Sequence, residues 1–335
     1  MSKLPVPSIY AAIQIHARMH PHETAVVTNT EILTYRRFCN VIDRVSRMLQ
    51  AQNLPADSRV GVVVGSPYLS WLANIALSRL GLLTCICPQS SLDVLQPTVV
   101  VSDSPLTYKG AKVIVMTKEW FDPEAAPLDP VHDTPLDPDK PARIVLSSGT
   151  TGVPKLVMFT AMETDERLRT LPLAYGLTPT SRTLCLMGMP SVGGFVWPIG
   201  TWMAGGVVLL TTPGPKKPLV QLLRDKPTHL FVSTAQLEQL VQGLPQEFTP
   251  QTGMVTYVAG SVLPRALNHA ARARLGQALV MIYGSTEVGT VTIAPAAHVD
   301  IKPGLTGYVC PPAEVQIVDE NGLEVATGAP GIVRT

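Results

Sequence analysis

Residues 146–155 read LSSGTTGVPK, and this stretch sets the expectation for the fold. It follows the apolar run at residues 144–146, which predicts a buried strand, and it ends at the cation Lys155. Gly149 and Gly152 can adopt positive φ, so the backbone N–H groups of the loop can converge. Converging N–H groups, hydroxyls and a lysine together form a cradle for phosphate. The residues predicted to bind phosphate are Ser147, Ser148, Gly149, Thr150, Thr151, Gly152 and Lys155.

This loop does not follow the Walker pattern of P-loop NTPases. In the pattern GxxxxGK the lysine directly follows the last glycine, and a serine or threonine then holds magnesium. Here two residues separate Gly152 from Lys155, and Leu156 follows the lysine. A P-loop NTPase is therefore disfavoured. A polar Gly-Thr loop that binds no ligand remains the alternative for this segment taken alone.

Strand-like and helix-like segments alternate along the chain. Residues 60–64 are rich in valine, which is typical of a strand buried on both faces. Thr34 and Ser66 each precede apolar residues at helical spacing, so each predicts a capped helix. Residues 122–141 are rich in Pro and Asp and predict a surface linker, after which the alternation resumes over residues 143–282. Repeated strand–helix–strand order indicates parallel sheets covered by helices.

The pattern changes near the end of the chain. Residues 314–318 and 331–334 are strand-like, and the sequence DENG at residues 319–322 is a turn signal. These segments predict antiparallel β structure.

A second motif, YGSTE at residues 283–287, follows a predicted strand that ends at Ile282. In open α/β sheets the carboxyl ends of parallel strands face the ligand crevice. Tyr283 can stack on a purine, Thr286 can donate to a phosphate oxygen, and Glu287 can hold Mg²⁺. Taken alone, this segment could equally be a turn with a surface glutamate.

A third motif, VAGSVLP at residues 258–264, also leads from a predicted strand through a loop into a helix. Gly260 and Ser261 would allow the backbone to approach a flat base closely. An ordinary strand–loop–helix connection is the alternative.

The composition excludes several classes of protein. The net charge is only +1, so the chain lacks the large positive charge that would indicate a nucleic-acid or anionic membrane partner. The cysteines match no zinc pattern, favour a reducing, cytoplasmic setting, and include a pair, Cys85 and Cys87, expected on opposite faces of a strand. Polar residues interrupt the N-terminal segment, so we expect no signal peptide. No run approaches the ~18 apolar residues of a membrane helix.

The three motifs together resemble the adenylate-forming superfamily: acyl-CoA synthetases, peptide-synthetase adenylation domains and luciferases. They occur in that family's order, with 136 residues from Ser147 to Tyr283, and the resemblance covers nearly the whole chain. It implies the α/β fold of the N-terminal domain of these enzymes, with two helix-covered, mainly parallel sheets and the start of a β-rich subdomain. Further matching segments are LTYRRF (33–38), GLTPTSRTL (176–184), AGGVVLL (204–210) and GLTGYVCPPAEVQIVDENG (304–322).

The resemblance also implies a reaction. A carboxylic acid attacks the α-phosphate of MgATP, acyl-AMP forms and pyrophosphate leaves, and a thiol of CoA or of a carrier protein then takes the acyl group. Such chemistry requires control of charge at the α-phosphate and at the departing pyrophosphate. By resemblance, Thr150 and Thr151 hold the β,γ-phosphates, and Thr286 contacts the α-phosphate. The implied catalytic residues are Thr286, Glu287 and Lys155, with Glu287 as the Mg²⁺ ligand, and Gly260, Ser261, Tyr283 and Gly284 complete the ATP site.

The sequence departs from the family at the predicted acid pocket. Pro190 stands where many relatives have histidine, and Val192 stands where amino-acid adenylation domains place an aspartate. An α-amino acid is therefore disfavoured, and the mostly apolar lining favours an aryl or fatty acid. For Phe195 and Trp197, simple helix core is the alternative. The predicted pocket residues are Pro190, Ser191, Gly194, Phe195, Ile282 and Gly284.

The chain also stops, at GIVRT, before the place where the family carries a ribose-binding aspartate, a hinge and a small domain with a catalytic lysine. We expect residues 1–300 to form an α/β core of two subdomains that binds nucleotide and acid. Residues 301–335 would begin the β-rich subdomain, and the C-terminal lid domain would be absent. Three explanations of the early end remain open: an artificially truncated chain, a proteolytic fragment, or a natural short form.

Two functions follow from these patterns. The first is ATP-dependent activation of a carboxylic acid, with this chain alone impaired by the missing lysine. The second is a nucleotide-binding pseudo-enzyme or scaffold that has lost turnover. A sugar or protein kinase is disfavoured, because the chain has neither a conventional P-loop nor a catalytic Asp-containing loop.

Overall fold

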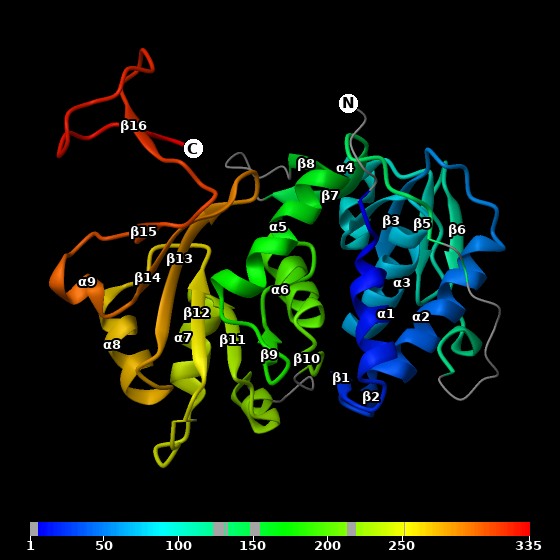
Figure 1. Cartoon of the computed structure of the whole chain (residues 1–335), viewed down its shortest axis with the longest axis horizontal. Helices are drawn as coiled ribbons and strands as arrows, with labels where there is room; N and C mark the ends of the chain where they lie inside the picture. Colours follow the sequence, from blue (N-terminus) through cyan, green and yellow to red (C-terminus); the bar gives the residue numbers. More distant parts are fainter. Residues whose placement is uncertain (1–5, 123–130, 132, 148–154, 213–218, 251) are drawn as a thin grey trace. The chain divides into compact units, whose positions relative to one another are not determined.

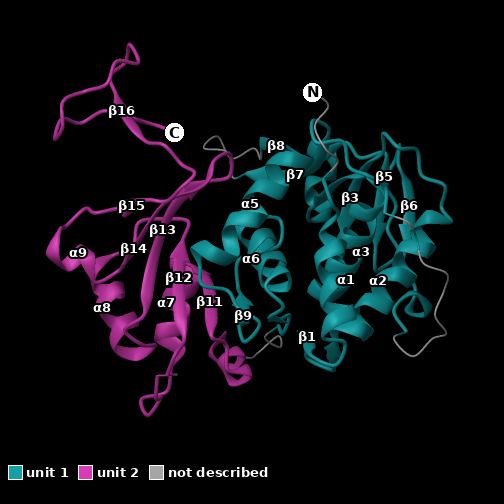
Figure 2. Cartoon of the chain, in the orientation of Figure 1, with its two compact units in different colours: residues 1–212 teal, residues 213–335 magenta. Residues whose placement is uncertain are grey.

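The chain forms two compact units, Met1–Thr212 and Pro213–Thr335 (Figures 1 and 2). The structure is a computed structural model, and it describes every residue except 1–5, 123–130, 132, 148–154, 213–218 and 251. The prediction of a core over residues 1–300 followed by a β-rich start at residue 301 stays a prediction. Each unit is described below by itself.

Unit 1 contains a six-stranded sheet in the order β6-β5-β3-β4-β7-β8. The five strands from β6 to β7 run parallel, and only β8 is antiparallel, against β7. This confirms the parallel sheet that the strand–helix alternation predicted. The bounds are β3 (Arg59–Val63), β4 (Leu83–Ile86), β5 (Val99–Ser102), β6 (Lys112–Val115), β7 (Pro141–Ser147) and β8 (Lys155–Thr160).

Four further strands of unit 1 follow the order β9-β10-β1-β2. The neighbours β9, β10 and β1 are parallel, and β2 returns antiparallel to β1. Their bounds are β1 (Thr24–Val27), β2 (Ile32–Thr34), β9 (Arg182–Cys185) and β10 (Val207–Leu209).

The helices of unit 1 begin where the sequence places polar caps. The Thr34 side chain accepts a hydrogen bond from the Arg37 N–H at the start of α2, and Ser66 does the same for Leu69 at the start of α3. Both predicted caps are confirmed. The helices are α1 (Ile9–Met19), α2 (Tyr35–Gln50), α3 (Pro67–Arg79), α4 (Leu92–Leu95), α5 (Ala161–Ala174) and α6 (Val192–Met203), with 3-10 turns η1 (Gln89–Ser91) and η2 (Lys118–Trp120).

An aromatic cluster forms the centre of the core of unit 1. The Trp71 ring on α3 lies 5.4 Å from the Phe195 ring and 5.3 Å from the Trp202 ring, both on α6. Trp202 also donates from Nε1 to the Ala25 carbonyl on β1, so its one polar atom is satisfied inside the core. The cluster thereby fixes α6 against α3 and β1.

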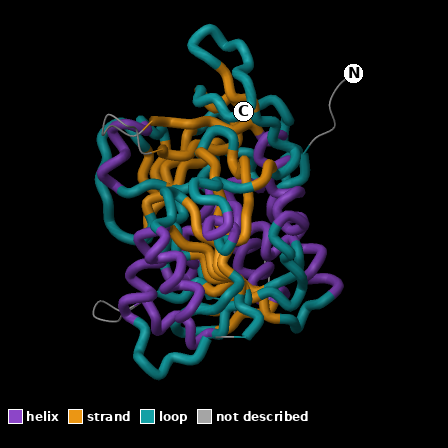
Figure 3. The backbone as a smooth tube through the Cα atoms, turned by 90° about the vertical axis from the view of Figure 1, so that its left-hand side faces the viewer, coloured by secondary structure: helices purple, strands orange, loops and turns teal. Residues whose placement is uncertain are grey.

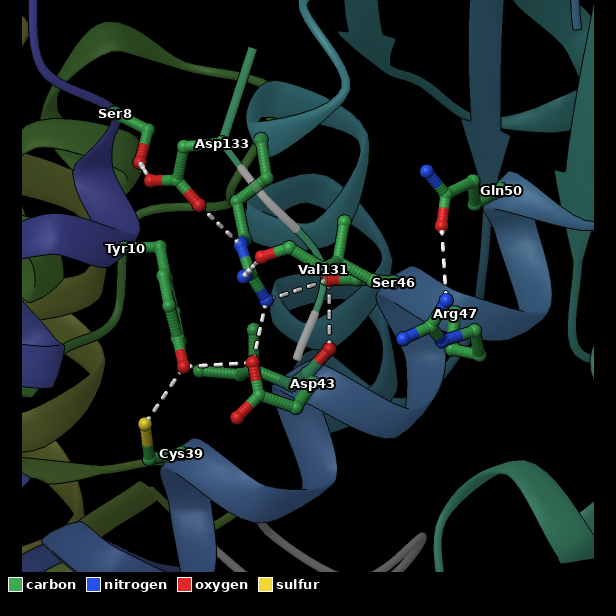
Figure 4. A network of polar contacts seen from close by, with 11 residues as sticks. Ser8, Tyr10, Cys39, Asp43, Ser46, Arg47, Gln50, Val131 and Asp133 are labelled. Atoms are coloured by element: carbon green, nitrogen blue, oxygen red, sulfur yellow. Dashed lines mark hydrogen bonds and ion pairs between the residues drawn. The ribbon is translucent and has the colours of Figure 1, made fainter. Parts of the chain in front are cut away.

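The segment predicted to be a surface linker is exposed at most of its described positions, but it is buried at Val131 and Pro138. Val131 is 4% exposed, and its carbonyl accepts a hydrogen bond of 2.6 Å from Arg79. Asp133 accepts from Arg79 Nε at 2.8 Å and from the Ser8 hydroxyl, and Asp43 accepts from Arg79 Nη1 (Figure 4). The segment is held because a buried guanidinium requires acceptors on all sides.

Unit 2 contains five strands in the order β15-β14-β13-β12-β11. β11, β12 and β13 are parallel, as predicted, whereas β14 and β15 are antiparallel. The segment before β11 forms a 3-10 helix, η3, instead of an α-helix. The bounds are η3 (Leu219–Asp225), β11 (His229–Ser233), α7 (Thr234–Gly243), β12 (Val255–Ala259), α8 (Arg265–Arg274), β13 (Leu279–Ser285), β14 (Gly289–Pro295), α9 (His298–Ile301) and β15 (Tyr308–Val309).

The end of the chain has the predicted antiparallel β texture. Short strands β16 (Gln316–Val318) and β17 (Ile332–Arg334) pair antiparallel, near the label C in Figure 3. In the predicted DENG turn the Gly322 N–H donates to the Asp319 carbonyl, and Gly322 has a φ of +79°. A positive φ there explains why glycine closes the turn.

Two other expectations concern the cysteines and the membrane. Cys85 and Cys87 share one buried apolar cluster, so the prediction of opposite strand faces is wrong; residues two apart in an extended chain point to the same side. Among the described residues, no helix is both long enough and apolar enough to cross a membrane.

Candidate active site

The predicted phosphate loop is bounded by a β-hairpin. Ser147 ends β7 and pairs with Lys155, the first residue of the antiparallel strand β8. The Lys155 side chain is exposed, whereas Ser147 is half-buried. The hairpin therefore brings the two ends of the loop together. Ser148, Gly149, Thr150, Thr151 and Gly152 lie outside the described residues.

The YGSTE motif lies on a second hairpin, in unit 2. The prediction that the strand ends at Ile282 is wrong, because β13 continues through Ser285. Tyr283 pairs with Thr292, and Ser285 pairs with Gly289, across the antiparallel strand β14. The strand extends because β14 supplies hydrogen-bond partners, a connection that the sequence analysis did not predict.

The functional side chains of this hairpin differ in exposure. The Tyr283 ring is 43% exposed, and Glu287 at the turn is also exposed, while Thr286 is half-buried. Gly284 has no room for a side chain, because a Cβ there would lie 1.9 Å from the Gly289 carbonyl oxygen. Glycine thus permits the tight hairpin that presents Tyr283 and Glu287.

The third motif lies beside the second. Gly260 and Ser261 directly follow β12, which is parallel to β13 in a register that pairs Val258 with Met281. Gly260 has a φ of +94° and open space around it, and the Ser261 carbonyl accepts a hydrogen bond from the Thr234 hydroxyl. The carboxyl ends of two neighbouring parallel strands therefore carry a glycine turn and an exposed aromatic ring.

The acid-pocket residues of unit 1 lie at the start of α6. The Ser191 hydroxyl accepts from the Gly194 N–H at 3.0 Å, so Ser191 is the N-cap that follows Pro190. A Cβ at Gly194 would lie 2.1 Å from the Gly188 carbonyl oxygen, which makes this approach possible only for glycine. Phe195 is 3% exposed, within the aromatic cluster.

The other residues predicted near the acid pocket have separate surroundings. Trp197 is 1% exposed, and its ring centroid lies 4.5 Å from that of Tyr175. Ile282 lies on β13, in unit 2, next to Tyr283. The role of these residues in binding an acid stays a prediction.

Glu287 could serve as the protein ligand of a magnesium ion whose remaining ligands come from substrate and water. Mg²⁺ in nucleotide enzymes typically takes one or two protein carboxylates and completes its shell with phosphate oxygens and water. One exposed carboxylate on a turn suits this arrangement. In the part of the chain that the structure describes, no group of three or more His, Cys, Asp or Glu residues could hold a metal by itself.

The profile of the family described as AMP-binding enzyme matches residues 13–334. The chain belongs to the AMP-binding enzyme family. This confirms the resemblance to the adenylate-forming superfamily and the predicted fold class.

Members of the AMP-binding enzyme family resemble this chain over most of its length. ScoC from Streptomyces coeruleorubidus, named as a fatty acid–acyl-carrier-protein ligase, is 27% identical and is matched over 99% of this chain and 70% of its own. A 2-succinylbenzoate–CoA ligase from Listeria innocua is 24% identical, over 93% of this chain and 68% of its own.

A solved structure shows the same fold as this AMP-binding family member. The ATP-bound structure of MatB from Rhodopseudomonas palustris superposes with a TM-score of 0.78 at 21% identity, over 96% of this chain and 69% of that one.

One residue that the sequence analysis overlooked is Arg143 on β7. It is 3% exposed, and its guanidinium carbon lies 3.3 Å from the centre of the Phe195 ring. In the sequence it only precedes the apolar run of a strand, so nothing local signals its burial. Arg143 also lines a cavity of unit 1.

Proposed function

We propose that this protein activates a carboxylic acid with ATP, forming acyl-AMP and releasing pyrophosphate, for later transfer to a thiol of CoA or of a carrier protein. The observation that carries the proposal is the pair of parallel strand ends in unit 2. There a glycine turn at Gly260 neighbours the strand that bears Tyr283 and leads to Glu287, in a chain of the AMP-binding enzyme family.

The proposed residue roles follow the chemistry of the reaction. A carboxylate oxygen of the acid forms a bond to the α-phosphorus, and the bond from that phosphorus to the β-phosphate bridging oxygen breaks. Tyr283 would stack on adenine beside Gly260 and Ser261, and Thr286 would donate to the α-phosphate. Because the transition state carries spread negative charge, positioned donors and cations are the main source of rate enhancement.

Two cations would balance the negative charge of the triphosphate. Glu287 would hold Mg²⁺, which neutralises phosphate oxygens when it is bound. Lys155 extends from the first residue of β8 into solvent, where it can reach an anion. Ser147, Thr150 and Thr151 would supply hydroxyl donors to the pyrophosphate as it leaves.

We further propose an aryl or fatty acid as the substrate class. The start of α6, at Pro190, Ser191, Gly194 and the buried Phe195, is largely apolar, and no carboxylate side chain occurs among residues 186–200 to hold an ammonium group. The acids in the names of the two relatives, a fatty acid and 2-succinylbenzoate, belong to this substrate class. All five cysteines are free thiols in the structure, which agrees with a reducing, cytoplasmic setting.

Pyrophosphate exchange tests this function. The chain is incubated with ATP, labelled pyrophosphate and a panel of aryl and fatty acids, and acid-dependent formation of labelled ATP is measured. We expect exchange with at least one acid. Tyr283→Phe should retain it, while Tyr283→Ala should reduce it about tenfold or more, because base–aromatic stacking contributes roughly 1–3 kcal/mol.

The outcomes separate the two functions considered for this chain. Acid-dependent exchange supports the ligase. ATP binding without exchange, for every acid in the panel and also in a form extended by a C-terminal domain, would favour a nucleotide-binding scaffold instead.

A further inference from the structure

Unit 1 contains a cavity of about 230 Å³ that none of the proposed ATP-binding residues lines. Helices α1, α3, α5 and α6 and strands β4 and β7 surround it, all within the same unit. Ile9 and Ala12 from α1 and Leu168 from α5 give it a mostly apolar lining, while Asn74 and Arg143 contribute polar groups. The cavity therefore joins a large apolar surface to one buried cation.

The Arg143 guanidinium is poorly satisfied for a buried charge. Its Nη2 donates to the Met189 carbonyl at 3.3 Å, and its Nη1 reaches Asn74 Oδ1 only at 3.5 Å. Its Nε is buried and has no hydrogen-bond partner among the described residues. In that part of the chain, no carboxylate forms an ion pair with Arg143.

Arg79 shows how this fold satisfies a buried arginine when the partners are internal. Its side chain is 1% exposed, and it forms ion pairs with Asp43 at 2.7 Å and Asp133 at 2.8 Å. The Val131 carbonyl and the Ser46 hydroxyl accept its remaining hydrogen bonds. Arg143 has an equivalent degree of burial without either carboxylate.

The carboxylate that lines the same cavity is already engaged. Asp165 on α5 forms an ion pair with Arg169, one helical turn further along. Burial lowers the pKa of Arg143 to about 9, so the guanidinium still carries its charge at neutral pH. A buried charge without a counter-charge is costly, and an anion that entered the cavity would relieve that cost.

We propose that this cavity is a binding site for a small amphipathic organic carboxylate, whose carboxylate group pairs with Arg143 and whose apolar body packs against α1 and α5. An inorganic anion would satisfy the cation but leave the apolar lining without contacts. An engineered apolar cavity of about 150 Å³ accommodates benzene, so this volume suits an acid of the size of benzoate or hexanoate. The cavity shares Phe195 with the proposed acid pocket, but none of the proposed ATP-binding residues lines it.

Calorimetric titration without ATP tests the proposal. Benzoate and hexanoate are compared with the neutral isosteres benzamide and hexanamide, and with chloride and phosphate as inorganic probes. We expect one site per chain for the carboxylates and affinities about tenfold or more weaker for the amides, because a hydrogen bond to a charged group contributes roughly 1.5–3 kcal/mol.

Substitutions of cavity residues test whether the carboxylate binds in this cavity. Arg143→Met should lose the preference for carboxylates over amides, and Arg143→Lys should retain part of it. Ala12→Phe should fill the cavity and abolish binding without altering the cation. Arg36→Met, at an exposed position on α2, is the matched control and should bind like the unmodified chain.

The proposed reaction also uses a carboxylic acid, so the two sites must be told apart. Binding at the cavity should persist in Ser191→Ala and Ile282→Ala, which change the proposed acid pocket at positions that do not line the cavity. Its loss in those variants, equal binding of acids and amides, unchanged binding in Arg143→Met, or no carboxylate binding at millimolar concentration would each overturn the proposal. If Arg143→Met does not fold, the acid–amide comparison and Ala12→Phe decide the question.

Discussion

At the scale of single residues, unit 1 buries two arginines in opposite surroundings. Arg79 has two carboxylates within 2.8 Å, whereas Arg143 contacts a carbonyl, an amide and an aromatic ring. Hydrogen bonds to Asp133 and Asp43 raise the pKa of Arg79 although burial opposes this, while burial lowers the pKa of Arg143. The first arginine stabilises the fold, and the second carries an unbalanced charge.

This contrast predicts opposite effects of the same substitution. Arg79→Met should destabilise the chain by about 3 kcal/mol, at the low end of buried pairs because both carboxylates keep partial exposure. Arg143→Met should be neutral or stabilising by up to roughly 4 kcal/mol in the absence of ligand, since a hydrophobic side chain replaces an uncompensated charge. Urea unfolding of the two variants measures both values. A strongly destabilised Arg143→Met would show that its ring and carbonyl contacts already compensate the charge.

At the scale of elements, Ser191 caps α6 at a position that we propose to line the acid pocket. Ser191 caps the helix by accepting from the Gly194 N–H, and its hydroxyl also donates to the Gly188 carbonyl at 2.7 Å. Both hydrogen bonds hold the turn that precedes Phe195.

A pair of variants separates these two roles. Ser191→Ala should lower the free energy of unfolding by about 1 kcal/mol because the cap is lost, and Ser191→Asn should restore most of it. Chemical denaturation measures the stability, and the acid dependence of pyrophosphate exchange measures the pocket. Equal stability of Ser191→Ala and the unmodified chain would contradict the capping role.

Most strands buried on both faces were predictable from the sequence, whereas the antiparallel strands β8 and β14 were not. The valine-rich strand β3 and the buried strands β11 and β12 follow from continuous apolar runs. Strand β8 lies at a sheet edge with Leu156 37% and Met158 56% exposed, so its apolar residues give no pattern of one buried face. Strand β14 was also not predicted: the YGSTE motif suggested the turn, but not the antiparallel strand that follows it and pairs with β13.

At the scale of the whole molecule, three short motifs predicted the family. Each motif is a continuous stretch of sequence, so its glycines and hydroxyl residues can be recognised without knowing the fold. The adjacency of Gly260 and Tyr283 follows from parallel strand order, so the sequence could predict it too. The cavity and the burial of Arg143 could not be predicted, because its contacts Asn74, Met189 and Phe195 come from remote parts of the chain. Function assigned by motif therefore leaves such a site unnoticed.

We propose that ATP binding depends on residues of the LSSGTTGVPK loop and on Tyr283. Calorimetric titration of ATP with Mg²⁺ into the unmodified chain, the double variant Thr150→Ala/Thr151→Ala, Tyr283→Ala and the control Tyr308→Ala tests it most directly. We predict one ATP per chain, with affinity reduced about tenfold or more by the threonine pair and by Tyr283→Ala, and unchanged in the control. ATP binding that both sets of substitutions leave intact, or no ATP binding by the unmodified chain, would contradict the account.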